Sequence, residues 1–153
     1  METNFLFQKE CKEIIGACYE VHNQLGPGFL ESVYQESLAL EFEERGIPFD
    51  QDAILNIWYK ETKLEKFFVA DFICHDSIII ELKALSDLTS EHYAQVLNYL
   101  KATDIEVGLL INFGSPRVQV KRFILNNKLT TDTNRLSTDS KILSTDNTDN
   151  TDD

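Results

Sequence analysis

Hydrophobic side chains recur at steps of three and four residues through the first part of the chain, the pattern of amphipathic helices. One such segment covers residues 7–25 and stops at Gly26-Pro27-Gly28, because glycine and proline disfavour helix. A second covers about residues 29–45 and ends at Gly46 and Pro48, residue types that commonly follow a helix C-terminus. We therefore predict two consecutive helices at the start of the fold.

The pattern then changes to short apolar runs separated by polar turns. Strands are predicted at residues 53–59, 66–74 and 78–83, with turns at 60–63 and 75–77. A third helix is predicted over residues 90–103, with Thr89 or Ser90 as its N-cap. Residues 107–113 are almost continuously apolar, which predicts a strand buried on both faces, and residues 118–125 predict a last strand. The order ααβββαββ predicts an α/β domain in which a three-strand meander precedes a crossover helix.

Composition changes sharply after about Asn126. Residues 127–153 contain six Asp and no aromatic residue, and the run Leu-Ser-Thr-Asp at 136–139 recurs at 143–146. Such polar sequence buries too little apolar surface to order itself. We predict one domain over residues 1–126 and a disordered, polar, acidic tail over residues 127–153.

Net charge and cysteine content exclude some classes of protein. The 153 residues include 26 acidic and 14 basic side chains, a formal charge of −12, which argues against a protein that coats nucleic acid through many phosphate contacts. The net charge does not exclude an enzyme with one local basic or metal-binding groove. No apolar run approaches the roughly 20 residues of a membrane span, and the first residues lack the pattern of a secretory signal. Cys11, Cys18 and Cys74 lack zinc-ligand spacing, so we expect reduced thiols and a cytoplasmic protein.

Candidate chemistry centres on Asp71, Glu81 and Lys83. Asp71 interrupts an apolar strand face and needs a partner there. If the turn has three residues, 75–77, Asp71 lies directly opposite Glu81, whereas a two-residue turn would place them on opposite faces. Two neighbouring carboxylates repel unless a cation or a proton lies between them. Both a site for Mg²⁺ or Mn²⁺ and an internal Asp–Lys–Glu salt-bridge cluster satisfy this pattern.

Two helices add further candidates. Gln95 and Tyr99 are four residues apart on the third helix and share a face, either as part of the helix's packed face or as part of a site. His92 lies one turn earlier, as a candidate base or metal ligand or as a half-buried surface residue. Glu31 near the start of the second helix favours the helix dipole, and it could also point inward.

These motifs carry a resemblance to known families. Gly28-Phe29-Leu30-Glu31-Ser32-Val33-Tyr34 is similar to the signature of the GxxExxY family. Asp71, followed by Glu81-x-Lys83 and Gln95-x-x-x-Tyr99, resembles the PD-(D/E)XK nuclease superfamily, in particular the branch with a helical Glu before the strands and a QxxxY helix after them. The resemblance covers about residues 5–125, with Ala70 in place of the proline of the superfamily's name.

The resemblance implies a restriction-endonuclease-like core, a mixed β-sheet flanked by helices. It implies that Asp71 and Glu81 bind Mg²⁺ or Mn²⁺, with Glu31 as an added ligand or a water-orienting acid. Lys83 would position or help to deprotonate the attacking water and stabilise the phosphate. Gln95 and Tyr99 would steady the site or contact nucleic acid.

We therefore expect a metal-dependent nuclease that acts on DNA or RNA and does not span a membrane. Several basic side chains could contact phosphates or be ordinary solvated residues: Lys60, Lys63, Lys66, Arg117, Lys121 and Arg122. One alternative is a catalytically idle domain of the same fold that acts as a binding or regulatory module. A weaker alternative is a hydrolase of small phosphate esters.

Overall fold

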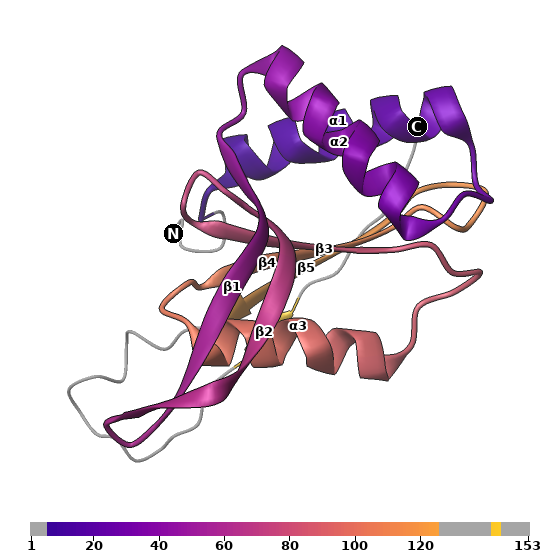
Figure 1. The fold of residues 1–153 in the computed structure, drawn as a ribbon. Helices are drawn as coiled ribbons and strands as arrows, with labels where there is room; N and C mark the ends of the chain where they lie inside the picture. The colour runs from indigo at the N-terminus through magenta and orange to yellow at the C-terminus, as the bar shows by residue number, and fades with distance from the viewer. Residues whose placement is uncertain (1–5, 126–141, 145–153) are drawn as a thin grey trace.

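A computed structural model describes residues 6–125 and the backbone of residues 142–144. Two helices precede a mixed sheet, and a third helix connects its two halves (Figure 1). The elements are α1 (Gln8–Leu25), α2 (Glu31–Arg45), β1 (Phe49–Tyr59), β2 (Thr62–Cys74), β3 (Ile78–Lys83), α3 (Ser90–Ala102), β4 (Val107–Asn112), β5 (Gln119–Leu125) and β6 (Ile142–Ser144).

The strands lie in the sheet in their sequence order, from β1 to β6. All neighbours are antiparallel except β3 and β4, which are parallel, because α3 carries the chain back between them. Helices α1 and α2 cover one face of the sheet and α3 covers the other (Figure 1). The predicted α/β class, the mixed sheet flanked by helices and the order ααβββαββ are confirmed.

Each face of the sheet has its own apolar core. Under α1 and α2, side chains such as Ile14, Leu38 and Ile80 are fully buried. Under α3, Ile79 and Leu110 pack with Leu100. Every residue of β4 is buried, as the continuous apolar run predicts for a central strand.

The β1–β2 hairpin is longer than its sequence pattern predicts. β1 begins at Phe49 and β2 at Thr62, each four residues early, and the turn contains only Lys60 and Glu61. The first six residues of β2 are all exposed, so no alternation of buried and exposed positions marks them in the sequence. We call residues 54–69 the outer hairpin; its tip extends beyond the sheet (Figure 1).

Smaller differences concern the ends of elements. α2 begins at Glu31 rather than at residue 29, because Gly28 adopts φ +115°, a backbone conformation outside the helical region. β5 begins at Gln119, one residue later than predicted, and α3 ends at Ala102. Thr89 is the N-cap of α3, one of the two predicted residues.

Three residues of the predicted tail, 142–144, lie within the described part of the chain. These residues form β6, which pairs antiparallel with β5, because an edge strand leaves backbone groups open to pairing. Residues 126–141 and 145–153 lie outside the described residues, so the prediction of a disordered tail stays a prediction. No helix in the described part of the chain is long and apolar enough to cross a membrane.

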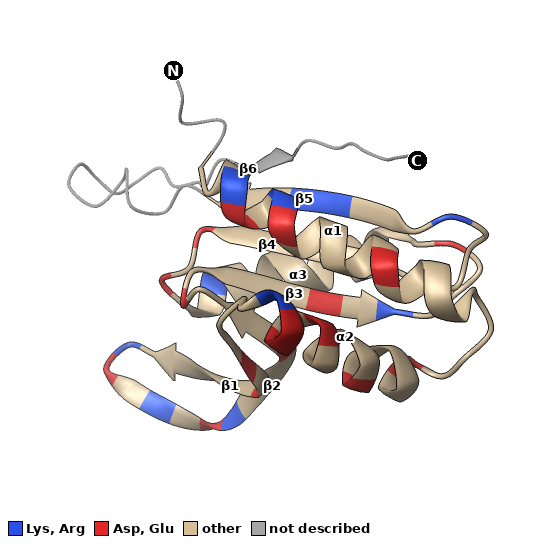
Figure 2. Ribbon diagram, turned by 90° about the horizontal axis from the view of Figure 1, so that it is seen from above, with Lys and Arg blue, Asp and Glu red and all other residues tan. Residues whose placement is uncertain are grey.

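Charged side chains are unevenly distributed (Figure 2). α2 carries five Glu and one Arg, whereas β5 carries Lys121 and Arg122 and no acidic residue. The outer hairpin carries three Lys and two Glu, so it is slightly basic on a strongly acidic chain.

Candidate active site

The turn between β2 and β3 sets the position of the two central carboxylates. Cys74 pairs with Ile78 and Phe72 with Ile80, which is the register of the three-residue turn 75–77. His75 and Asp76 both have φ near +55°, the left-handed conformation that such tight turns use. Continued by one step, this register places Asp71 opposite Glu81, as the sequence predicts for a three-residue turn.

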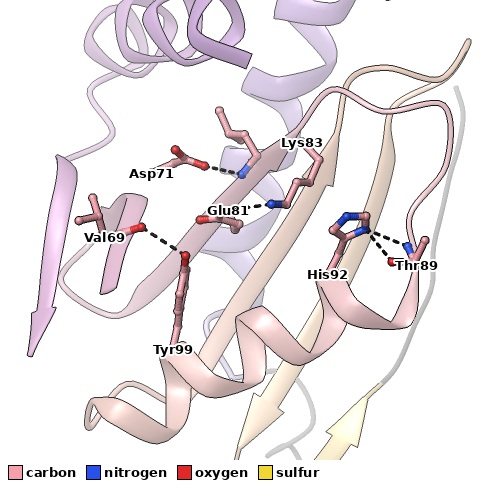
Figure 3. Close-up of polar contacts among 8 residues, drawn as sticks. Val69, Asp71, Glu81, Lys83, Thr89, His92 and Tyr99 are labelled. Atoms are coloured by element: carbon pink, nitrogen blue, oxygen red, sulfur yellow. Dashed lines mark hydrogen bonds and ion pairs between the residues drawn. The ribbon is translucent and has the colours of Figure 1, made fainter. Parts of the chain in front are cut away.

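Asp71 ends the regular pairing of β2 with β3. Its Oδ2 accepts a hydrogen bond of 2.7 Å from the backbone N–H of Leu82 (Figure 3). The last backbone-paired residues are Phe72 and Ile80, so a side-chain carboxylate takes the place of a strand carbonyl. On the N-terminal side of Asp71, β2 pairs with β1 in the outer hairpin.

Glu81 and Lys83 leave β3 toward the same space (Figure 3). Lys83 Nζ lies 3.7 Å from Glu81 Oε2, and both side chains are largely buried. The other oxygen of Glu81, Oε1, is buried and has no hydrogen-bond partner among the described residues. A buried acceptor without a donor is costly, so this oxygen calls for a cation or a proton.

The acidity of the two carboxyl groups agrees with that geometry. Burial, together with the charge of Asp71 and against a partial offset from Lys83, raises the pKa of Glu81 to about 8. Burial also raises the pKa of Asp71, while the Leu82 amide opposes the rise and Glu31 adds to it. Close carboxylates in a poorly solvated site favour a shared proton or a cation between them.

α3 presents Tyr99 and Gln95 to this cluster. The Tyr99 hydroxyl donates to the backbone carbonyl of Val69 at 3.3 Å (Figure 3). Burial raises the pKa of Tyr99, and the charges of Glu81 and Asp71 raise it further, whereas a hydrogen bond from Gln95 lowers it. Gln95 Oε1 is buried and without a partner in the described part of the chain. Tyr99 therefore lies close enough to Glu81 and Asp71 for their charges to act on it, with Gln95 beside it.

α2 approaches the cluster from the opposite side. Glu31 is exposed at the first turn of α2, yet its charge acts on both Asp71 and Glu81. One turn later, Gln35 Nε2 donates to Asp52 Oδ1 at 3.0 Å and to the Asp71 carbonyl at 3.3 Å. Gln35 thus ties α2 to β2 at the site; in the sequence, its only signal is that it shares a helical face with Glu31.

Tyr34, the last residue of the GxxExxY run, has a structural position. It is fully buried and stacks on Phe113 with ring centroids 4.6 Å apart. Its hydroxyl donates to the Gly26 carbonyl and accepts from the Phe29 N–H. Tyr34 therefore fixes the loop before α2, and with it the position of Glu31.

Three candidate residues lie elsewhere. Lys63 and Lys66 are on β2, eight and five residues before Asp71, or at most about 26 and 17 Å along an extended strand. His92 closes a capping box, in which its Nδ1 accepts the Thr89 N–H at 2.9 Å (Figure 3). His92 thus serves the N-terminus of α3 and is not part of the carboxylate cluster.

The donor set of Asp71 and Glu81 fits a divalent oxygen-binding cation. Asp71 and Glu81 supply carboxylates, and the unpartnered Glu81 Oε1 is a free ligand position of the kind that Mg²⁺ and Mn²⁺ prefer. Among the described residues, however, no three His, Cys, Asp or Glu side chains are close enough to form a metal site by themselves. Glu31 as a third ligand stays a prediction.

Comparison with known families agrees with this geometry. The family model of the PD-(D/E)XK nuclease superfamily matches residues 8–123, which include every element from α1 to β4 and most of β5. The chain therefore belongs to the PD-(D/E)XK nuclease superfamily, a class whose substrates are nucleic acids. Searches of curated proteins and of solved structures found no match.

Proposed function

We propose that the protein is a metal-dependent nuclease that hydrolyses phosphodiester bonds. The observation that carries this proposal is the junction of β2 and β3, where Asp71 and Glu81 have raised pKa values and Lys83 lies 3.7 Å from Glu81. Phosphodiester hydrolysis needs an activated water and positive charge near the phosphate. This junction has carboxylates for the cation and an ammonium beside them.

Each residue of the site would have a different role in hydrolysis. Asp71 and Glu81 would hold Mg²⁺ or Mn²⁺, with Glu31 as an added ligand or a water-orienting acid. The bound cation would supply a polarised water and charge for the phosphate. Lys83 would stabilise negative charge that develops on the phosphate and orient the attacking water.

The remaining site residues would act around that centre. Gln95 and Tyr99 would steady the β2 backbone at Val69 and contact nucleic acid, and Lys63 and Lys66 would contact phosphates. We also propose membership of the GxxExxY family, which the positions of Gly28, Glu31 and Tyr34 support. Three unpaired cysteines among the described residues support a cytoplasmic location.

A second candidate is a catalytically idle domain that binds nucleic acid or regulates a partner. The Glu81–Lys83 ion pair supports it, because lysine can neutralise one carboxylate without any cation. The net charge of −12 also disfavours tight unaided binding of nucleic acid.

The test is cleavage of labelled single- and double-stranded DNA and RNA with Mg²⁺, Mn²⁺ or chelator. We expect cleavage that needs the cation and disappears in Asp71→Asn and Glu81→Gln. Glu44→Gln, an exposed charge change near the far end of α2, is the matched control and should cleave normally. Equal cleavage by all four proteins would indicate a contaminant, and no cleavage of any substrate would favour the idle domain.

A further inference from the structure

The outer hairpin exposes an apolar stripe that the proposed chemistry does not use. Ile54 pairs with Val69 and Asn56 with Phe67, and beyond a register shift Trp58 pairs with Lys63. Alternation along each strand places Ile54, Asn56 and Trp58 on one face of β1, with Val69 and Phe67 beside them on β2. The exposed fractions are 60% for Ile54, 56% for Trp58, 51% for Phe67 and 42% for Val69. We call these four side chains the hairpin stripe.

The opposite face of the same hairpin accounts for its stability. Leu55 and Ala70 are buried against α3, and the Phe68 ring lies 5.1 Å from that of Tyr99. The hairpin is therefore held in place without the stripe. Several exposed aromatic and aliphatic side chains gathered on one face are unusual on a protein surface that has no partner.

Position and charge narrow the choice of partner. Val69 is two residues from Asp71 along β2, or about 7 Å, so one end of the stripe lies close to the candidate active site. Lys60, Lys63 and Lys66 lie around the tip and along β2, with Glu61 and Glu65 between them, and Figure 2 shows both charges on the hairpin, the lysines in excess by one. Aromatic rings flanked by lysines bind single-stranded nucleic acid by stacking on bases and attracting phosphates. A duplex keeps its base faces covered by stacking on one another.

We propose that the hairpin stripe is a stacking platform for single-stranded nucleic acid, which guides an unpaired strand to the Asp71–Glu81 site. This inference rests on the proposed function for its nucleic-acid partner and adds the strandedness of the substrate. Phe67 and Trp58 stack on bases, Lys63 and Lys66 contact the backbone, and Val69 and Ile54 extend the apolar floor toward Asp71.

Trp58 makes the proposal directly measurable, because it is the only tryptophan of the chain. The full chain in chelator and low salt is titrated with oligothymidylate, oligouridylate and a duplex, and Trp58 fluorescence is recorded. We expect quenching by the single strands and weaker binding of the duplex. Phe67→Ala should weaken single-strand binding about 5- to 150-fold. Leu40→Ala, which removes an exposed apolar side chain from α2, should leave single-strand binding unchanged.

A second assay uses labelled oligonucleotide anisotropy, so that Trp58→Ala can be tested in the same way. Preferential binding of duplex, absence of quenching, or an unchanged affinity in Phe67→Ala would overturn the proposal. Self-association that Phe67→Ala abolishes would also overturn it and assign the stripe to a second copy of the chain. Because no cation is present, the result is independent of catalysis: cleavage without quenching rejects only the platform, and quenching without cleavage rejects only the nuclease.

Discussion

The Asp71 carboxylate accepts the backbone N–H of Leu82 at 2.7 Å, where regular strand pairing would use a carbonyl. This bond holds the Asp71 carboxylate between two strands, close enough to Glu81 and Glu31 for both to affect its pKa. One oxygen of Asp71 thus has a structural role, while the carboxylate as a whole supplies charge. The two roles can be separated by substitution.

Asp71→Asn and Asp71→Ala should differ in stability. Asn retains an oxygen that can accept the Leu82 N–H and removes the charge that repels Glu81. Without metal, we expect Asp71→Asn to be at least as stable as the wild type. Ala leaves the N–H unpaired and should cost about 1–3 kcal/mol relative to Asn. Urea unfolding in chelator measures both. If Asn costs as much as Ala, the charge itself stabilises the fold, as in a salt-bridge cluster.

Divalent cation should stabilise the folded protein. A cation that binds only the native state adds about 2.7 kcal/mol at a hundredfold excess over its Kd. We expect Mn²⁺ to raise the thermal midpoint of the wild type and of the control Glu44→Gln. Glu81→Gln and Asp71→Asn should lose most of the gain. Equal midpoints with Mn²⁺ and with chelator would remove the metal site and favour the idle domain.

Stability without metal should depend on pH through Glu81. Its pKa is raised from 4.5 to about 8 in the folded protein, so the native state holds a proton that the unfolded chain releases. Stability from this group is therefore full below about pH 4.5 and is lost as pH rises through about 8. Each pH unit between these values is worth at most about 1.4 kcal/mol.

The comparison that isolates this effect is wild type against Glu81→Gln, by urea unfolding in chelator between about pH 5 and 8. The wild type should lose stability relative to the variant as pH increases. A constant difference across that range would mean that Glu81 keeps an ordinary pKa, with Lys83 as a sufficient counter-charge.

Lys83→Met should separate catalysis from metal binding. Lysine donates hydrogen bonds and does not bind cations, so the variant should retain stabilisation by Mn²⁺. Cleavage should fall by about 10²- to 10³-fold, the usual loss when a group that stabilises developing charge is removed. Wild-type cleavage rates in the variant would exclude Lys83 from the mechanism.

Removal of residues 127–153 should leave the domain folded. In the described part of the chain, both apolar cores consist of residues that precede Asn126, and β6 adds three paired residues at the edge of the sheet. We expect the thermal midpoint to change by less than a few degrees, which corresponds to less than about 1 kcal/mol. A larger decrease would show that the tail contributes to the fold and that the boundary at residue 126 is wrong.

The sequence by itself determined the elements and their order, because helix and strand periods are local properties of the chain. It reduced the register at the site to two alternatives, a three-residue or a two-residue turn after Cys74, and the structure has the three-residue turn, with Cys74 paired to Ile78. The pairing of Asp71 with Glu81 follows from residues no more than ten positions apart.

Only the tertiary structure decided which distant side chains complete the site. Gln35 reaches the Asp71 carbonyl from 36 positions away and Tyr99 reaches Val69 from 30, and His92 caps α3 instead of joining the carboxylates. The outer hairpin is likewise longer than its pattern, since its exposed residues leave no periodic signal. These contacts depend on how helices pack on the two faces of the sheet, and packing is set by the whole core rather than by any local run of residues.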